Sequence, residues 1–507
     1  MTRRPSPFII TLLLFFSSLA TAIAGQAGGS GGGGENEFGA NPTLFATLAA
    51  INAAGYDAGL DSSLNARFQV RRQVREELQK KNIPSLPELR EFYKAHKKST
   101  DTADLSQYIS FALIAGGAPD FALPESGVPP DVESLRGLSP LLARFYKESN
   151  IEDLWKRSQT AYALAISQYQ DPVINTLFEA NGYVRNPSGS GTLGRRFQIF
   201  LGLLAAPDQV QVRSYSNNYY IVITPTNAPV ANDIRDAYLS YLLDPLTFRY
   251  SMVIKEKKAL DKYAQDAPAL PLQYKDNFSL LVTECLIKAI DSRLIHGNAD
   301  ARTAFVDEAM REGYILTAEF ADLLPAYEKQ DEALRLYYPD LVNALDVRKV
   351  EKQLKKVQFV QSIPARMVAP PAQMQLSPAE DSLEKAEGLY EQHDFANAQK
   401  LFRKVFEQTT DKSMQGRAYY GLARIAVQEN KKDEALDLFQ RTADDNPSPA
   451  ITAWSHVYLG RLALAAGDPG KANTQFKLAL AIPEASEKAH EAAEKGLQSS
   501  SQGEKQQ

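Results

Sequence analysis

The sequence predicts a mainly α-helical protein with a small β element in its first two thirds and a superhelix of helical repeats in its last third. Apolar residues recur at intervals of three and four along most of the chain, which is typical of amphipathic helices. Residues 196–224 depart from this pattern, because β-branched and aromatic residues dominate there. After residue 379, similar residues recur at a fixed spacing. We therefore expect an α+β helical N-terminal domain followed by an α–α superhelix.

The first 24 residues have the pattern of a secretory signal peptide. Arg3 and Arg4 give a positive start, 8–16 forms a short apolar core, and 22–24 is a small-residue cleavage site. This pattern predicts export, with a periplasmic or extracellular location after cleavage. No later run approaches the roughly 20 apolar residues that a membrane span needs, so we expect no transmembrane segment.

Composition shifts divide the rest of the chain. Residues 25–37 are glycine-rich and predict a flexible tether. Residues 38–363 predict one mostly helical domain, and the prolines of 364–378 predict an extended linker. Residues 379–497 predict three repeats and a capping helix, and the polar residues 498–507 predict a disordered tail.

Composition also narrows the function. A chain of 507 residues with 44% hydrophobic content can build more than one core. The net charge of -5 would become more negative on loss of Arg3 and Arg4, which disfavours a nucleic-acid binder. Cys285 is the single cysteine, so no internal disulfide is possible. The sequence shows no cofactor motif that we accept, and we expect no cofactor.

The β signal lies in a single segment. Between Arg196 and Thr224, two runs rich in β-branched and aromatic residues flank a turn at Ser216, Asn217 and Asn218. Such runs around a polar turn are typical of a hairpin. We predict two or three antiparallel strands in 196–224.

A repeat pattern is present in the last third of the chain. Ala398, Ala435 and Ala472 are 37 residues apart, and each is followed four residues later by phenylalanine. The phenylalanines are Phe402, Phe439 and Phe476, and the small residues twelve before each alanine are Ala386, Ala423 and Gly460. Small residues let the two helices of a hairpin approach closely, while the phenylalanine fills the gap to the next hairpin.

This segment resembles tetratricopeptide repeats. The matching residues are Tyr419, Leu422, Ala423, Ala435, Phe439 and Pro447 in the middle copy, and Leu459, Gly460, Ala472, Phe476 and Ala479 in the last. The spacing of 37 exceeds the usual period of about 34, and Lys385 replaces a leucine in the first copy. The resemblance implies a stacked array whose concave surface binds a protein partner.

A second resemblance concerns the segment "NDIRDAYLSYLLDP". An H-E-x-x-H zinc frame placed here puts Asp236 and Ser240 where histidines would stand and Ala237 where the general base would stand. Glu284 follows at the place of a third ligand. The region resembles a degenerate gluzincin-like bacterial secreted metallopeptidase domain, which implies a pseudoenzyme without metal. The alternative is an ordinary amphipathic helix.

These observations predict an exported, non-catalytic scaffold that binds a protein or peptide through its repeat groove. The predicted partner-binding residues are Arg417, Tyr420, Arg424, Trp454, Val457 and Arg461. Arg424 and Arg461 occupy equivalent places in successive repeats, so we expect an acidic partner or one with a C-terminal carboxylate. Local ion pairing of these arginines is the alternative for the site. A metal-dependent peptidase or hydrolase using Asp236 and Glu284, and a cell-envelope assembly factor, are the alternatives for function.

Overall fold

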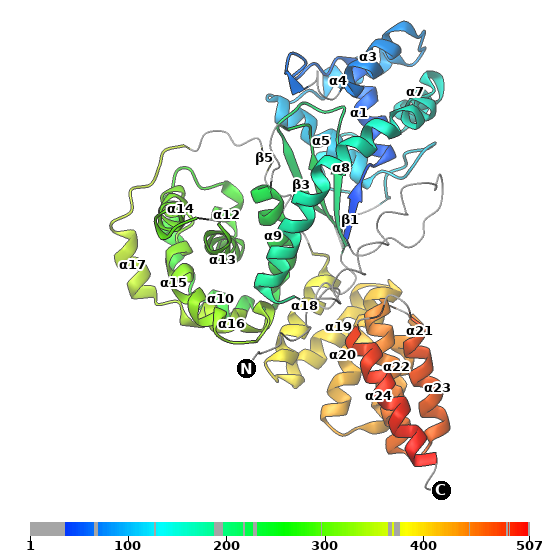
Figure 1. The fold of residues 1–507 in the computed structure, drawn as a ribbon, viewed down its shortest axis with the longest axis vertical. Coiled ribbons are helices and arrows are strands. Elements are labelled where there is room, and N and C mark those ends of the chain that lie inside the picture. The colour runs from blue at the N-terminus through cyan, green and yellow to red at the C-terminus, as the bar shows by residue number, and fades with distance from the viewer. Residues whose placement is uncertain are drawn as a thin grey trace, which may run out of the picture. The chain divides into compact units, whose positions relative to one another are not determined.

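The structure is a computed structural model, and it confirms a mainly α-helical chain with one small sheet (Figure 1). It describes residues 36–504 except 65–68, 126–127, 187–195, 216–217, 227–230, 296, 363–367, 370–375, 446, 483–484 and 486. The predicted signal peptide, most of the tether and most of the linker lie outside the described residues. Within the described part, no helix is both long enough and apolar enough to cross a membrane.

The first helices pack around one apolar helix, α1 (Pro42–Ala54). Asn41 caps its start by accepting a hydrogen bond from the Leu44 amide at 2.8 Å, and Gly55 ends it at a φ of 120°. Nearly every α1 side chain is buried. The surrounding helices are α3 (Val70–Lys80), α4 (Leu86–Ala95), α5 (Asp101–Ile114), α7 (Leu138–Ser149) and α8 (Ile151–Val184), with the short α6 (Pro130–Glu133) beside α5.

The sheet has the strand order β1-β2-β4-β3-β5. Its strands are β1 (Asn36–Gly39), β2 (Arg196–Leu201), β3 (Val210–Tyr215), β4 (Asn218–Ile223) and β5 (Val368–Ala369). The predicted hairpin is confirmed, since β3 and β4 are antiparallel. The prediction of a wholly antiparallel sheet is wrong: β2 runs parallel to both β1 and β4, and β5 runs parallel to β3.

The connection 202–209 explains the parallel pair. It crosses the end of β4, where the Gly202 amide donates to the Ile223 carbonyl at 2.8 Å, and so it carries the chain to the far side of β4. The strand pattern of the sequence shows which residues form strands but not which neighbour each strand takes. β5 also places Val368 and Ala369, inside the predicted linker, on the edge of this sheet.

The middle of the chain forms a helical cluster around α13 (Phe278–Leu294). Its neighbours are α9 (Ala231–Arg249), α10 (Ser251–Lys255), α12 (Leu272–Asp276), α14 (Ala299–Glu312) and α15 (Thr317–Glu328). α11 (Asp261–Gln265), α16 (Leu334–Ala344) and α17 (Val347–Leu354) complete the cluster. α13 is buried on almost all sides because it is apolar around most of its circumference.

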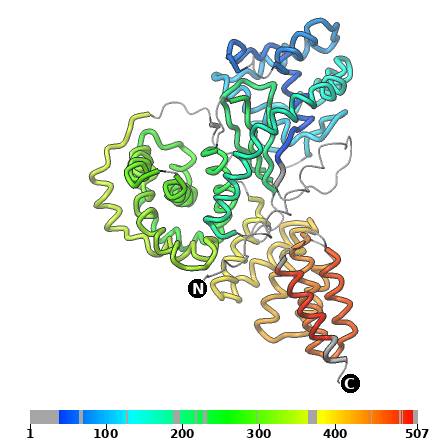
Figure 2. The backbone as a smooth tube through the Cα atoms, viewed as in Figure 1, coloured from blue at the N-terminus to red at the C-terminus, as the bar shows by residue number. Residues whose placement is uncertain are grey.

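The last third forms antiparallel helical hairpins, which Figure 2 traces from α18 onward. The helices are α18 (Pro378–Glu391), α19 (Phe395–Gln408), α20 (Lys412–Gln428), α21 (Lys432–Asp445), α22 (Pro449–Ala465), α23 (Pro469–Leu480) and α24 (Glu487–Glu504). A disordered tail from 498 is wrong for 498–504, because α24 continues to Glu504. Its Ser500 side chain is buried and donates to the Leu497 carbonyl, which favours the helix over a free tail.

Candidate functional site

The repeats are locked together by phenylalanines that contact glycines. A Cβ atom placed on Gly421 would lie 2.2 Å from Phe402 Cζ, and one on Gly460 would lie 2.5 Å from Phe476 Cε1. Gly496 of the capping helix also meets Phe476, at 2.4 Å. These distances leave no room for a methyl group. Of the small residues in the predicted spacing, Gly460 makes such a contact, whereas Gly421 and Gly496 were not part of that pattern.

The middle repeat uses aromatic stacking at the corresponding contact. Phe439 stacks on Tyr458 with ring centroids 4.8 Å apart and nearly parallel planes. Tyr420 meets Phe439 edge-on at 6.0 Å, and Trp454 lies 6.1 Å from Tyr458. A continuous row of rings therefore runs from α20 to α22. We call Tyr420, Phe439, Tyr458 and Trp454 the aromatic row.

Arg417 is not available at the surface, because its charge is used inside the molecule. Its Nη2 lies 3.1 Å from Glu384 of α18, and both side chains are more than nine-tenths buried. Glu384 also accepts from Arg249 of α9 at 3.0 Å. A partner would have to displace Glu384 to reach Arg417.

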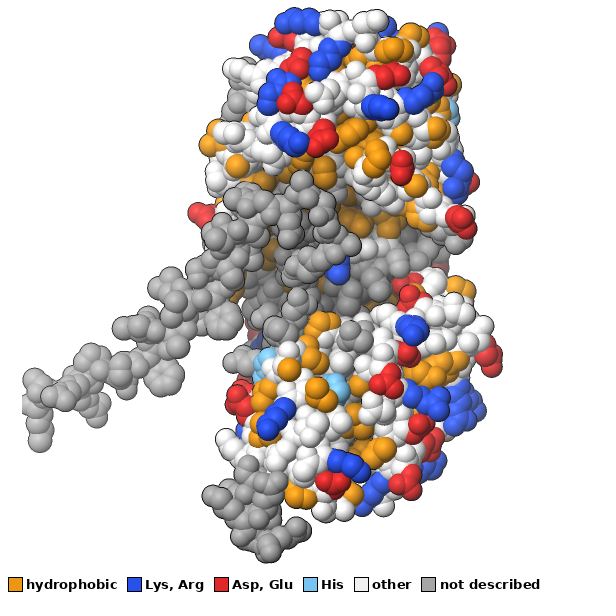
Figure 3. Space-filling model, turned by 90° about the vertical axis from the view of Figure 1, so that its right-hand side faces the viewer, with side chains coloured by type: hydrophobic (Ala, Val, Ile, Leu, Met, Phe, Trp, Pro, Cys, Tyr) orange, Lys and Arg blue, Asp and Glu red, His pale blue; other side chains and the backbone are white. Residues whose placement is uncertain are grey.

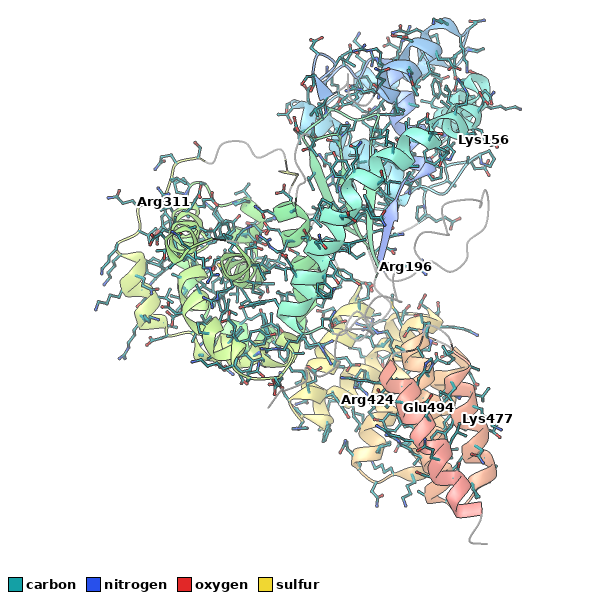
Figure 4. The ribbon with its side chains drawn as sticks, viewed as in Figure 1. Lys156, Arg196, Arg311, Arg424, Lys477 and Glu494 are labelled. Atoms are coloured by element: carbon teal, nitrogen blue, oxygen red, sulfur yellow. The ribbon has the colours of Figure 1, made fainter. Side chains whose placement is uncertain are left out.

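Arg424, labelled in Figure 4, is paired in the same way. Its Nη2 lies 2.6 Å from Glu387, and its guanidinium lies over the rings of Tyr390 at 4.3 Å and Tyr420 at 4.8 Å. Burial lowers the pKa of Arg424, but Glu387, Tyr420 and Tyr390 together outweigh burial and raise the pKa above its usual value. The local ion pair that the sequence left open as an alternative is thus observed for Arg424.

Val457 cannot face a partner, and its predicted placement is wrong. It is fully buried and packs with Ala472 and Phe476 in the core of the last repeat. Tyr420 and Trp454 are half-buried. From the sequence alone, a valine three residues after Trp454 could line the groove or lie in the core. The packing of α23 against α22 places it in the core.

Arg461 differs from its repeat equivalent. It is exposed, and its guanidinium lies 5.6 Å from the centre of the Tyr458 ring. Within the described residues it makes no ion pair. Arg424 pairs with the residue 37 positions earlier, Glu387, whereas the residue 37 positions before Arg461 is another arginine, Arg424. The preceding repeat therefore has a cation, and no carboxylate, at the position equivalent to Glu387.

The residues of the degenerate zinc frame lie together between α9 and α13. Lys288 Nζ lies 2.6 Å from Asp236 Oδ2 and 3.3 Å from Glu284 Oε1, so an ammonium group bridges the two carboxylates. Arg235 Nε pairs with Asp291 at 2.6 Å beside them. Asp236 and Glu284, the two carboxylates of the alternative hydrolase, are thus brought close, and one lysine lies between them.

The protonation of this cluster follows from its charges. Burial alone would raise the pKa of Asp236, but Lys288, the hydrogen bond with Asp291 and the charge of Arg235 together outweigh burial and lower the pKa to about 2. Burial raises the pKa of Glu284, and burial together with neighbouring Asp236 raises that of Asp291. Ser240 hydrogen-bonds to the Asp236 carbonyl, and Ala237 is buried in the core. The cluster is a buried network of three carboxylates and two cations between α9 and α13.

Sequence reasoning missed Arg249 and the glutamates of α18. Glu384, Glu387 and Glu391 recur at helical spacing and form one stripe, which was a visible signal. Arg249 is more than 130 residues from each of them, and no pattern in the sequence links it to α18.

Comparison with known proteins identifies the class of the C-terminal part. A family described as a tetratricopeptide repeat-like domain matches residues 329–499, about a third of the chain. The match begins just after α15, so it includes α16, α17 and the predicted linker as well as the hairpins. No curated protein and no solved structure matches the chain. The C-terminal part is a tetratricopeptide repeat-like domain, and nothing supports the metallopeptidase resemblance.

Proposed function

We propose that the protein is a non-catalytic scaffold that binds a partner protein through the outward side of α22. The repeat-like domain supports a role in protein interaction. The observation that supports this place of binding is that Arg461 is exposed and makes no ion pair within the described part of the chain. The half-buried ring of Tyr458 lies beside its guanidinium, and the half-buried ring of Trp454 lies 6.1 Å from Tyr458.

The chemistry of this place favours a carboxylate ligand. A guanidinium group can donate two parallel hydrogen bonds to a carboxylate, and adjacent aromatic rings add buried area at low entropic cost. Tyr458 is held rigidly by its stack on Phe439, so Arg461 rests against an ordered ring. We infer an acidic peptide or a free C-terminus as the partner's binding element.

A nucleic-acid ligand is not favoured by the surface. On the face shown in Figure 3, acidic and basic side chains alternate and are interspersed with apolar ones. Nucleic-acid binding generally needs a basic patch or stripe. The charge of this face and the net charge of -5 both support a protein partner.

The test uses a labelled peptide with acidic residues and a free C-terminus, with its C-terminal amide as the matched ligand. Arg461→Ala should weaken binding by about 1.5–3 kcal/mol, the usual value of a charge-assisted hydrogen bond. Lys477→Ala is the control, since Lys477 is an exposed cation on α23, a helix that carries no residue of the aromatic row (Figure 4). Equal binding by the Arg461→Ala and Lys477→Ala variants would contradict the proposal.

Export and the lack of catalysis belong to the same proposal. The pattern of residues 1–24 supports export, and cleavage after Ala24 in secreted protein would test it by N-terminal sequencing. Lys288 between Asp236 and Glu284 supports a non-catalytic N-terminal part, since its ammonium group occupies the space between the two carboxylates. One equivalent of tightly bound zinc in the purified protein would favour instead the metal-dependent hydrolase.

A further inference from the structure

A polar contact joins α18, the first helix of the hairpins, to the end of α9. Glu384, Gly388 and Glu391 are on one side of α18, and Arg249, the last residue of α9, lies against them. We call Glu384, Glu387 and Glu391 the glutamate face of α18. All three side chains are at least four-fifths buried.

The geometry is that of a guanidinium site. Arg249 Nη2 lies 3.0 Å from Glu384 Oε2, and its Nη1 lies 3.2 Å from Glu391 Oε1. Tyr250 donates its hydroxyl to Glu391 Oε2 at 2.5 Å. Arg417 of α20 donates a hydrogen bond to the other carboxylate oxygen of Glu384, Oε1, at 3.1 Å. One arginine thus spans two carboxylates that are fixed by other groups, which is a built site and not a chance surface pair.

Gly388 lets the ligand approach closely. A Cβ atom on Gly388 would lie 2.3 Å from the Arg249 carbonyl oxygen and 2.6 Å from its Cγ. These contacts involve backbone, so they cannot be relieved by rotating a flexible side chain. The site therefore selects an arginine whose own backbone packs on α18.

The contact is ionic, and the apolar cores on its two sides are separate. The core of the first part includes buried residues from Leu44 to Leu354, whereas α18, α19 and α20 share a different cluster around Leu383 and Phe402. Opening the contact would expose charges, which water solvates well, and would leave both cores intact. A site of this kind can exchange its ligand without unfolding.

We propose that the glutamate face of α18 is an arginine-binding site, that Arg249 is its internal ligand, and that an arginine-bearing segment of a partner protein competes for it. This site is distinct from the one proposed around Arg461, and it takes a ligand of opposite charge. Occupancy by a partner would release α18 from α9.

The test uses the full chain and a fluorescent, end-capped peptide with the sequence of residues 247–251, Thr-Phe-Arg-Tyr-Ser. Arg249→Gln removes the internal guanidinium from the two carboxylates and should bind this peptide at least about tenfold more tightly than the unsubstituted protein, where that guanidinium occupies them. A peptide with lysine in place of arginine should bind weakly, since lysine cannot span both carboxylates. Arg249→Lys gives a second variant should Arg249→Gln fold poorly.

Two further variants in the Arg249→Gln background locate the peptide. Glu384→Gln should abolish the gain in binding, because it removes a carboxylate. Gly388→Ala should also abolish it, because the methyl group blocks the approach, while Gly182→Ala, a helical glycine with open space around it, should leave it unchanged. Circular dichroism checks folding. Equal peptide binding by the unsubstituted protein, Arg249→Gln and Arg249→Lys would overturn the proposal, as would binding that survives Glu384→Gln.

Discussion

The middle and last repeats carry an arginine at the equivalent position, Arg424 and Arg461, but the first is buried in an ion pair and the second is exposed. Arg424 is buried against Glu387 and two tyrosine rings, whereas Arg461 is exposed over one ring. The residue 37 positions earlier differs in the two cases: it is a glutamate, Glu387, for Arg424 and an arginine, Arg424, for Arg461. Equivalent positions in a repeat therefore share their packing but not their charge environment, and only one of the two is open to a partner.

Removing the partner of Arg424 should have the largest effect. Glu387→Ala leaves a buried guanidinium without a carboxylate, which generally costs about 3–5 kcal/mol. Urea unfolding measures the loss. Glu387→Met combined with Arg424→Leu should recover most of it, because an apolar pair of similar volume replaces the ions. A loss below about 1 kcal/mol for Glu387→Ala would mean that Arg424 is solvated and resembles Arg461.

The buried carboxylate cluster extends the comparison to pH. The folded pKa of Asp236 is about 2, below its ordinary value of 3.8, so its charge stabilises the fold above pH 4 and this contribution disappears as the pH falls toward 2. The contribution is about 2 kcal/mol. The unfolding free energies of the unsubstituted protein and of Asp236→Asn should therefore converge between pH 5 and pH 2. A constant difference over this range would contradict the assignment of the charge to Asp236.

Exchanging the charges of the middle repeat should make Arg461 resemble Arg424. Glu387→Arg with Arg424→Glu keeps an opposite-charge pair and also gives Arg461 a carboxylate 37 residues earlier. We expect a stability change within about 1.5 kcal/mol and binding of the acidic peptide as weak as in Arg461→Ala. Peptide binding unchanged by the exchange would mean that the repeat register does not control Arg461.

Arg461→Ala should have the smallest effect on stability. An exposed residue without an ion pair usually contributes within about 0.5 kcal/mol. The melting temperature should stay nearly constant while peptide binding falls. A clear loss of stability would show that the contact with Tyr458 holds the last repeat together.

Local patterns in the sequence were enough for the repeats and for the hairpin. The alanine, phenylalanine and small-residue spacing predicted which side chains meet, since helices of similar length stack in the same register each time. Phe476 against Gly460 follows from that rule, whereas Gly421, which meets Phe402, lies outside the pattern. The β3–β4 hairpin follows from strand composition around a short turn. The end of the last helix was missed because its polar serines and glutamines favour no structure strongly by themselves.

The sequence by itself determined the helical class, the repeat and the place of the strands, because these depend on spacings within a few tens of residues. The tertiary structure alone decided that β2 lies beside β4, that Lys288 bridges Asp236 and Glu284, and that Arg249 reaches Glu384. Apart from the contact of Lys288 with Glu284, four positions earlier on the same helix, these pairings join residues 50 or more positions apart or depend on which side of a strand the chain passes. An ion pair between distant segments leaves no periodic pattern in the sequence, so its partner is selected by the packed geometry and by the cost of leaving a buried charge alone.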